Sequence, residues 1–301
     1  MDSFRRLHPG VNIVYYAVII VSTVVFSNPV FVLLSFLGSL TYSLKLKDGE
    51  SLKGLMIMPM ILALATLITN AFFVHRGMKI IAYIFNKPVT GEALAFGAIA
   101  GVMISAVLLW FFTYNKVITQ DKTIFLFGHI APVVSVVFSA VLGFIPRLTD
   151  RAESIKNGQK GMGFDSASGN FKFKAKQAAR QLSILTTWSL ESSMQTADSM
   201  KCRGYGIRRR TTYYPFRFKK NDGGVLAFLV LLSIISTVGA LSDEMKFKCY
   251  PTFMYGQPHI LGISGVTAYL LLVFLPLELE FLDMIRWRRM DVEEGEVHVS
   301  D

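Results

Sequence analysis

The side chains that could do chemistry in this sequence are few and widely separated. Five histidines are scattered along it, at positions 8, 75, 129, 259 and 298. They form no pair at helical spacing, so the pattern typical of zinc ligands is missing. The two cysteines, Cys202 and Cys249, lie on different segments and indicate neither a disulfide framework nor a cysteine-based metal site. The glycine cluster at Gly158–Gly163 has the wrong spacing for a phosphate-binding loop, so we expect it to end a helix.

Polar or soft side chains inside apolar segments leave two interpretations open. His129 could contact a substrate or a proton, or it could be hydrogen-bonded to a neighbouring helix. Met56, Met58 and Met60 alternate around Pro59 and could bind a soft metal, or they could simply pack. No Ser/His/Asp set, H-E-x-x-H motif or pair of intramembrane aspartates occurs, which argues against an intramembrane hydrolase. We expect no catalysis by this chain.

The segments that carry these residues are strongly apolar. Of the 301 residues, 52% are hydrophobic and only 17% are charged, against about 25% charged in an ordinary soluble domain. Uncharged stretches approach or reach the roughly 20 residues that a membrane helix needs; they are Val11–Ser27, Pro29–Leu44, Gly54–Phe73, Leu94–Tyr114, Thr123–Ile145 (apart from His129), Gly223–Ser242 and His259–Leu277. Buried helices of a soluble protein would carry charges on their exposed faces. The sequence therefore predicts an all-α membrane protein, a multi-pass helical bundle.

Charge divides the chain into four parts. Residues 1–145 and 223–285 hold the membrane helices, residues 146–222 form a basic region, and residues 286–301 form a tail. Between Arg147 and Lys220 there are sixteen Lys or Arg and five Asp or Glu, an excess of eleven, whereas the whole chain has a net charge of +10. Loops rich in Lys and Arg stay in the cytoplasm, so we expect the basic region and the C-terminus to be cytoplasmic.

The same rule creates a conflict at the N-terminus. Arg5 and Arg6 also favour the cytoplasm, and no cleavage site follows, so we expect Val11–Ser27 to remain in the mature protein. Five full crossings before residue 146 would then place the basic region outside. Either one early segment is re-entrant or lies along the membrane, or the N-terminus is external. The stretch His75–Thr90 could be part of the irregularity, and the number of crossings stays open.

The basic region is expected to contain two helices. The first is expected to begin at Pro146, because proline is favoured in the first turn, and to end at Gly158–Gly163. The second is expected to run from about Lys174 to Arg203 and to end at Gly204 and Gly206. Its apolar stripe and neighbouring polar stripe indicate a helix at the membrane boundary or packed against other helices.

Two segments carry a specific resemblance. They are Phe144-Ile-Pro146 with Ile155-Lys-Asn-Gly-Gln-Lys-Gly-Met-Gly163, and Ala197-Asp-Ser-Met-Lys-Cys-Arg-Gly-Tyr205. Together they resemble the two coupling helices of the T components of energy-coupling factor (ECF) transporters, a family that includes the cobalt-transport permease. The N-terminal Leu7-His-Pro9 also fits, and the resemblance spans roughly residues 7–280. It implies two long cytoplasmic coupling helices within the helical membrane fold.

In that family each coupling helix ends in an Ala-Arg-Gly-like motif that docks on one of two cytoplasmic ATPase subunits. The resemblance places Cys202, Arg203 and Gly204 on the second motif, with the cysteine replacing alanine. It places Gly161, Met162 and Gly163 on the first motif, where Met162 replaces the arginine and Lys160 lies nearby. The alternative role for Arg203 is that of one more basic residue near lipid headgroups.

The resemblance implies a non-catalytic T subunit of an ATP-driven transporter in the cell membrane. Its implied partners are two ATPase subunits, a substrate-binding membrane subunit and the lipid bilayer, with no nucleic acid. The implied cargo is a vitamin or a metal ion, and no cofactor is bound by this chain, since ATP is bound by the partner subunits. A self-contained secondary transporter or channel remains the alternative; it predicts inverted internal repeats, and none is evident. A membrane-bound enzyme would need convergent polar residues within the membrane.

Overall fold

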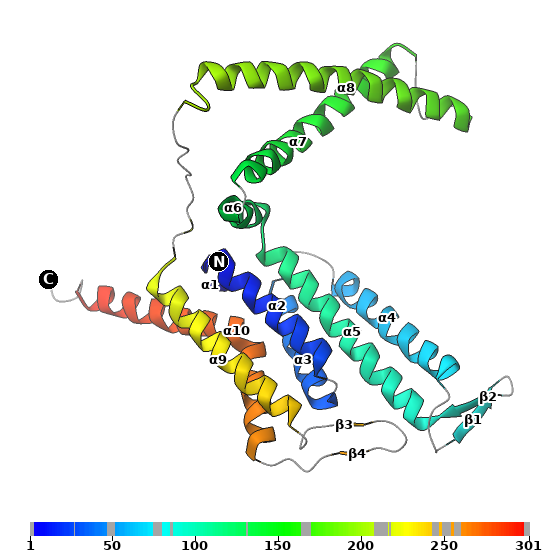
Figure 1. Cartoon of the computed structure of the whole chain (residues 1–301), viewed down its shortest axis with the longest axis vertical. Coiled ribbons are helices and arrows are strands. Elements are labelled where there is room, and N and C mark those ends of the chain that lie inside the picture. The colour runs from blue at the N-terminus through cyan, green and yellow to red at the C-terminus, as the bar shows by residue number, and fades with distance from the viewer. Residues whose placement is uncertain are drawn as a thin grey trace. The chain divides into compact units, whose positions relative to one another are not determined.

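The fold was analysed in a computed structural model, which describes residues 3–26, 28–46, 52–74, 80–84, 87–130, 132–163, 170–207, 216, 218–242, 247–248, 254–255 and 260–297 (Figure 1). The chain forms two compact units. Unit 1 consists of Met1–Lys122 and Phe216–Asp301, and unit 2 consists of Thr123–Pro215.

Unit 1 is a bundle of helices. It contains α1 (Ser3–Arg6), α2 (Pro9–Val25), α3 (Pro29–Lys45), α4 (Leu52–Phe73), α5 (Gly91–Val117), the start of α6 (Gln120–Ile130), α9 (Lys220–Leu241) and α10 (Ile260–Val297). Helices α2 and α3 begin in the same way, with proline in the first turn and a side-chain cap before it. His8 Nδ1 accepts a hydrogen bond from Gly10 N at 3.2 Å, and Asn28 Oδ1 accepts one from Val30 N at 3.0 Å.

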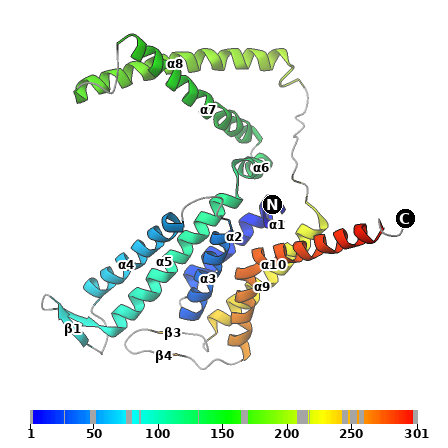
Figure 2. The same ribbon diagram turned by 180° about the vertical axis from the view of Figure 1, so that it is seen from behind.

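Within the described part of unit 1, four helices are long and apolar enough to cross a membrane: α4 (over Met56–Phe73), α5, α9 and α10 (over Ile260–Ile285). Helices α2 and α3 are apolar but have only 17 residues each. The prediction of a multi-pass helical membrane protein is confirmed. Two short antiparallel hairpins were not predicted: β1 (Ile80–Ile84) with β2 (Lys87–Thr90), and β3 (Phe247–Lys248) with β4 (Met254–Tyr255). Both lie at the same end of the bundle (Figures 1 and 2).

Small residues allow the helices of unit 1 to approach closely. Gly97 and Gly101, one turn apart on α5, face the α4 backbone, and a Cβ at Gly101 would lie 2.8 Å from Ala63 O. On α9, a Cβ at Gly239 would lie 2.4 Å from the Cα of Gly265 on α10. Such contacts suit a membrane, where the association of helices depends on close packing rather than on the exclusion of water.

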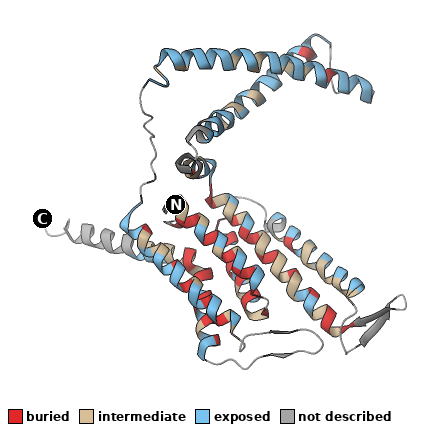
Figure 3. Cartoon of the chain, in the orientation of Figure 1, coloured by how far each residue is buried: buried red, intermediate tan, exposed pale blue. Residues whose placement is uncertain are grey.

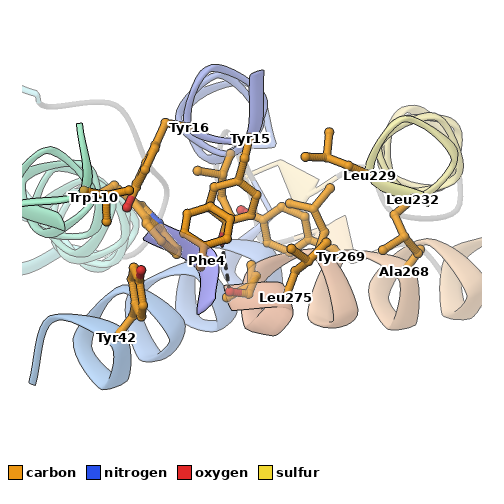
Figure 4. Close-up of a cluster of buried hydrophobic side chains, with 14 of the residues drawn as sticks. Phe4, Tyr15, Tyr16, Tyr42, Trp110, Leu229, Leu232, Ala268, Tyr269 and Leu275 are labelled. Carbon is orange, nitrogen blue, oxygen red and sulfur yellow. Dashed lines mark hydrogen bonds between the residues drawn. The ribbon is translucent and has the colours of Figure 1, made fainter. Parts of the chain in front are cut away.

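An aromatic and polar core joins α2, α3, α5 and α10. Trp110 Nε1 donates to Ser35 Oγ at 3.0 Å, and the Thr23 hydroxyl lies 2.7 Å from Ser35 Oγ and 3.1 Å from the Tyr269 hydroxyl. All four side chains are buried. Phe4 of α1 lies among the rings of this core (Figure 4). The hydrogen bonds satisfy polar groups that would otherwise be unpaired in an apolar interior.

Unit 2 consists mainly of α7 (Pro132–Gly161) and α8 (Phe171–Cys202), two helices whose surfaces are largely exposed (Figure 3). The expected helix start at Pro146 is wrong. Helix α7 starts at Pro132 and continues through Pro146. A proline removes only one hydrogen bond from a helix that is already formed, and Pro132 occupies the favoured first turn. The apolar stretch Thr123–Ile145 is accordingly divided between α6 and α7.

Candidate docking tips of helices α7 and α8

The end of α8 has a well-defined backbone geometry. Cys202 is the last helical residue, Arg203 is the C-cap, and Gly204 follows with φ of +78°. Gly204 N donates to Lys201 O at 2.9 Å and Tyr205 N donates to Met200 O at 3.0 Å. These two bonds are those of a Schellman motif, in which a left-handed residue after the cap turns the chain out of the helix. The predicted stop at Gly204 is confirmed, and we call Cys202–Gly204 the α8 tip.

The α8 tip is accessible. Cys202 is an exposed free cysteine, and the Arg203 side chain is also exposed. Among the described residues, none forms an ion pair with Arg203. The Lys201 ammonium lies 3.9 Å from the Asp198 carboxylate one turn back, at the surface. The guanidinium therefore projects from a rigid helix end with its five N–H donors available.

The end of α7 shares part of this geometry. Gly161 is the last helical residue, Met162 follows, and Gly163 has φ of +82°. Gly163 N donates to Lys160 O at 3.1 Å, the same bond that Gly204 makes in the α8 tip. Met162 and Arg203 therefore occupy the same position relative to their helix ends, immediately before a left-handed glycine. We call Gly161–Gly163 the α7 tip.

The two tips differ in side-chain chemistry. Met162 is 67% exposed and apolar, where the α8 tip presents a cation. Lys160 is exposed one residue before Gly161 and supplies the nearest positive charge on α7. Among the described residues, no atom lies within 4 Å of a Cβ placed at Gly161 or Gly163, so the α7 tip is open on their side. An open tip of this kind can accept a larger side chain without a clash.

An aromatic contact fixes the crossing of α7 and α8. Phe144 on α7 stacks on Trp188 of α8 with ring centroids 6.0 Å apart and planes 7° from parallel. The Arg151 guanidinium lies over the same indole ring at 5.2 Å. Cation–π contacts of this kind contribute about 0.5–1 kcal/mol at exposed sites. The apolar stripe expected on this helix does not by itself identify the contact.

A cavity of about 480 Å³ lies beside this crossing. Its lining comes from α7 (Ser139, Ala140, Val141, Gly143, Phe144 and Arg147) and from α8 (Ser193, Thr196, Ala197 and Met200). Among the described residues of this lining, Arg147 is the one that carries a charge. Further along the same helices Gln159 and Gln177 are buried, 2% and 3% exposed. Neither glutamine was singled out from the sequence, because no periodic pattern distinguishes a buried amide from an exposed one.

The other residues considered from the sequence do not join the tips. Within the described part of the chain there is no group of three or more His, Cys, Asp or Glu that could hold a metal ion. His75, His259, His298 and Cys249 lie outside the described residues, as does the side chain of His129. Around Pro59, Met58 and Met60 are exposed on α4, 64% and 75%.

Comparisons with known proteins agree with this architecture. A family model described as CbiQ, cobalt transport protein, matches residues 2–214. The chain is 35% identical over 100 residues to the energy-coupling factor transporter transmembrane protein EcfT of Lactobacillus helveticus, covering 33% of this chain and 36% of that protein. It is 31% identical over 107 residues to EcfT of Lacticaseibacillus paracasei, covering 34% and 40%. It is 30% identical over 103 residues to EcfT of Lactococcus lactis subsp. cremoris, covering 34% and 39%. The matched region thus spans about two fifths of these relatives.

Proposed function

The chain belongs to the CbiQ cobalt transport protein family, and from this membership we propose that it is the transmembrane coupling (T) subunit of an ECF-type transporter. Such a subunit passes the conformational change of two ATPase subunits to a separate substrate-binding membrane subunit. The observation that carries the proposal is the pair of long helices with matching tips, of which the α8 tip presents Arg203. The EcfT names of the relatives support the assignment.

The geometry of the tips suits docking on a partner. A helix is stiff, and a Schellman end leaves no flexible residue between the last turn and Arg203. A guanidinium can form two parallel hydrogen bonds with a carboxylate, or it can bind the carbonyl oxygens at the end of a partner helix. Movement of an ATPase subunit would thus be transferred along α8 to its crossing with α7 at Trp188. ATP would be bound and hydrolysed by the partners, and this chain would be non-catalytic and bind no cofactor.

The positions of the helices suggest an orientation. Helices α2, α3, α4 and α5 would cross the bilayer before unit 2, since even 17 residues lie within the range of about 17–25 for a span. Helix α6, with 11 residues, is too short to cross. The number of crossings between any two of the following parts is even, so they lie on the same side of the membrane: Arg5, the end of α3, unit 2 and the end of α10. Because that side carries the basic residues, we assign it to the cytoplasm and both hairpins to the exterior.

The substrate-binding subunit would decide whether a vitamin or a metal ion is carried. A self-contained secondary transporter or channel is the competing proposal, and it predicts uptake by the purified chain alone in liposomes. The ECF proposal predicts that uptake needs the two ATPase subunits, the substrate-binding subunit and ATP.

The deciding experiment is co-purification of Arg203→Glu with the ATPase subunits, together with uptake in reconstituted vesicles. We expect weaker association or ATP hydrolysis without uptake, because a carboxylate would repel the group that binds the guanidinium. Lys220→Glu is the matched control, since Lys220 is an exposed cation at the start of α9. Unchanged association and unchanged uptake for Arg203→Glu would refute docking through this tip.

The orientation has its own test, because Cys202 is exposed and lies in the α8 tip. In a Cys249→Ser variant, Cys202 is the one remaining cysteine. A membrane-impermeant maleimide should then label inverted vesicles and leave intact cells unlabelled. Labelling of intact cells would reverse the proposed orientation.

A further inference from the structure

The chain leaves unit 1 after Lys122 and returns to it at Phe216. The residues of unit 1 at these two connections are far apart in sequence. Both connections nevertheless contact one short stretch at the N-terminus, Phe4–Asn12. This stretch comprises the end of α1 and the start of α2. We call this stretch the N-terminal segment. The residues that make these contacts belong to neither tip.

The first connection is held by hydrogen bonds. Lys122 Nζ donates to Arg5 O at 2.7 Å. The Asn12 side chain, with its amide oriented to satisfy both neighbours, accepts from Lys122 Nζ at 2.9 Å and donates to Phe4 O at 3.2 Å. Lys122 is only 4% exposed and Asn12 is fully buried. A lysine this deeply buried needs such acceptors, and here the N-terminal segment provides them.

The second connection is held by an aromatic contact. The Phe218 ring packs edge-on against His8, with centroids 5.3 Å apart and planes at 71°. His8 is itself fixed, because its Nδ1 caps α2. One residue after Phe218, Lys219 N donates to the Asp222 carboxylate at 2.9 Å and begins α9. The connection therefore meets the N-terminal segment immediately before it becomes helical.

The N-terminal segment is anchored in the core of unit 1. Phe4 is 1% exposed and makes edge-to-face contacts with Tyr15 at 5.0 Å, Tyr16 at 6.2 Å and Tyr42 at 6.2 Å. These rings belong to α2 and α3 and surround Phe4 (Figure 4). Such aromatic pairs add stability beyond that of the apolar area that they bury. The segment is thus a rigid element shared by both connections.

We propose that the N-terminal segment is a latch that positions both connections of unit 2, through Lys122 at one and Phe218 at the other. The latch couples the two connections mechanically. A displacement of either connection is therefore transmitted to the other connection and to the aromatic core. Lys122, Asn12, His8 and Phe218 are positioning residues in this scheme and do not touch a partner. The mechanical role rests on the proposed function, whereas the physical link between the connections does not.

The link can be tested without partners by hydrogen exchange of the purified full-length chain. Phe218→Ala removes an exposed ring at the second connection and leaves the core intact. We expect exchange to quicken at residues 218–222 and also at residues 118–124. Lys122→Met removes the ammonium at the first connection and should produce the reciprocal effect at 218–222. Loss of a hydrogen bond to a charged group should raise exchange by local opening roughly tenfold or more.

Lys220→Met is the control, because it removes an exposed cation beside the second connection, and none of the described contacts of the N-terminal segment involves Lys220. It should leave exchange at residues 118–124 unchanged. Effects confined to the mutated connection in both Phe218→Ala and Lys122→Met would overturn the latch.

The mechanical role is tested in vesicles with the ATPase and substrate-binding subunits. Phe218→Ala should assemble normally and hydrolyse ATP, yet lose at least half of its uptake per ATP. Normal uptake per ATP would overturn the mechanical role. Failure of the proposed function is distinguishable, because it would appear as unchanged association and uptake in Arg203→Glu whatever the exchange data show.

Discussion

Replacing Gly204 by alanine should weaken the proposed docking of the α8 tip without destabilising the membrane bundle. Gly204 has φ of +78°, in the left-handed region where a Cβ costs about 1–2 kcal/mol. The added methyl would not clash, since its nearest neighbour would be Ile207 Cδ1 at 3.5 Å. The whole effect should therefore come from the backbone, which would leave the Schellman geometry part of the time and let Arg203 swing away from its docking direction.

The magnitude follows from that penalty. Each 1.4 kcal/mol is a factor of ten in an equilibrium constant, so Gly204→Ala should raise the Kd for the ATPase subunit about 5- to 30-fold. Gly204→Asn should have a smaller effect, because asparagine tolerates the left-handed region. Gly224→Ala is the control, since Gly224 is helical on α9 with open space around it and should bind like the unmodified chain.

The assay is surface-immobilised binding of the purified ATPase subunits to the chain in nanodiscs. Thermal unfolding of each variant is measured in parallel. The refuting result is that Gly204→Ala and the unmodified chain bind the ATPase subunits with equal affinity while hydrogen exchange shows that α8 is intact. That result would show that the left-handed conformation of Gly204 is not needed to orient Arg203 for binding. An equal loss in Gly224→Ala would show that the effect is not specific to the tip.

Three further predictions follow from particular contacts. Met162→Arg should leave assembly unchanged or strengthen it in co-purification, because the α7 tip is open; lost assembly would show that its motif is misaligned. Gly239→Leu should lower the unfolding temperature in detergent, because a Cβ at this position would lie 2.4 Å from Gly265 Cα. Overpacking of this kind costs about 1–3 kcal/mol of stability. An unchanged unfolding temperature would contradict the close contact of α9 with α10. Burial, and then the nearby Arg5 charge, lower the pKa of Lys122 to about 8. Between that pKa and the value near 10.5 of an exposed lysine, the unfolded chain binds more protons than the folded one. The free energy of unfolding should therefore rise with pH across this window, relative to Lys122→Met measured by thermal unfolding; a parallel pH dependence would contradict the lowered pKa.

Much of the helical architecture could be predicted because its causes are local. Long uncharged stretches favour membrane helices, and α4, α5 and α9 lie close to their expected bounds. The end of α8 could be predicted because glycine is the residue that tolerates the left-handed conformation after a helix. The matching end of α7 follows from the same chemistry at Gly163.

The remainder depends on contacts between distant residues. Whether Pro146 starts a helix or lies inside one depends on the residues before it. Because α7 already begins at Pro132, the helix continues through Pro146. The contact of Phe218 with His8 joins residues about 210 positions apart and has no periodic signal. The stacking of Phe144 on Trp188 fixes a crossing that apolar spacing alone leaves undetermined.

The two tips can show how side-chain chemistry affects the binding of each tip to its partner. Met162 and Arg203 each precede a left-handed glycine that donates to the carbonyl three residues back, so comparing them tests side-chain chemistry at the same backbone position. A cation on one tip and a thioether on the other should bind with unequal strength, since only Arg203 can form charge-assisted hydrogen bonds with a carboxylate of a partner. The ATPase contacts should therefore be unequal. Arg203→Met would make the tips alike, and the loss of one ATPase subunit with retention of the other in the purified complex would identify which surface each tip binds.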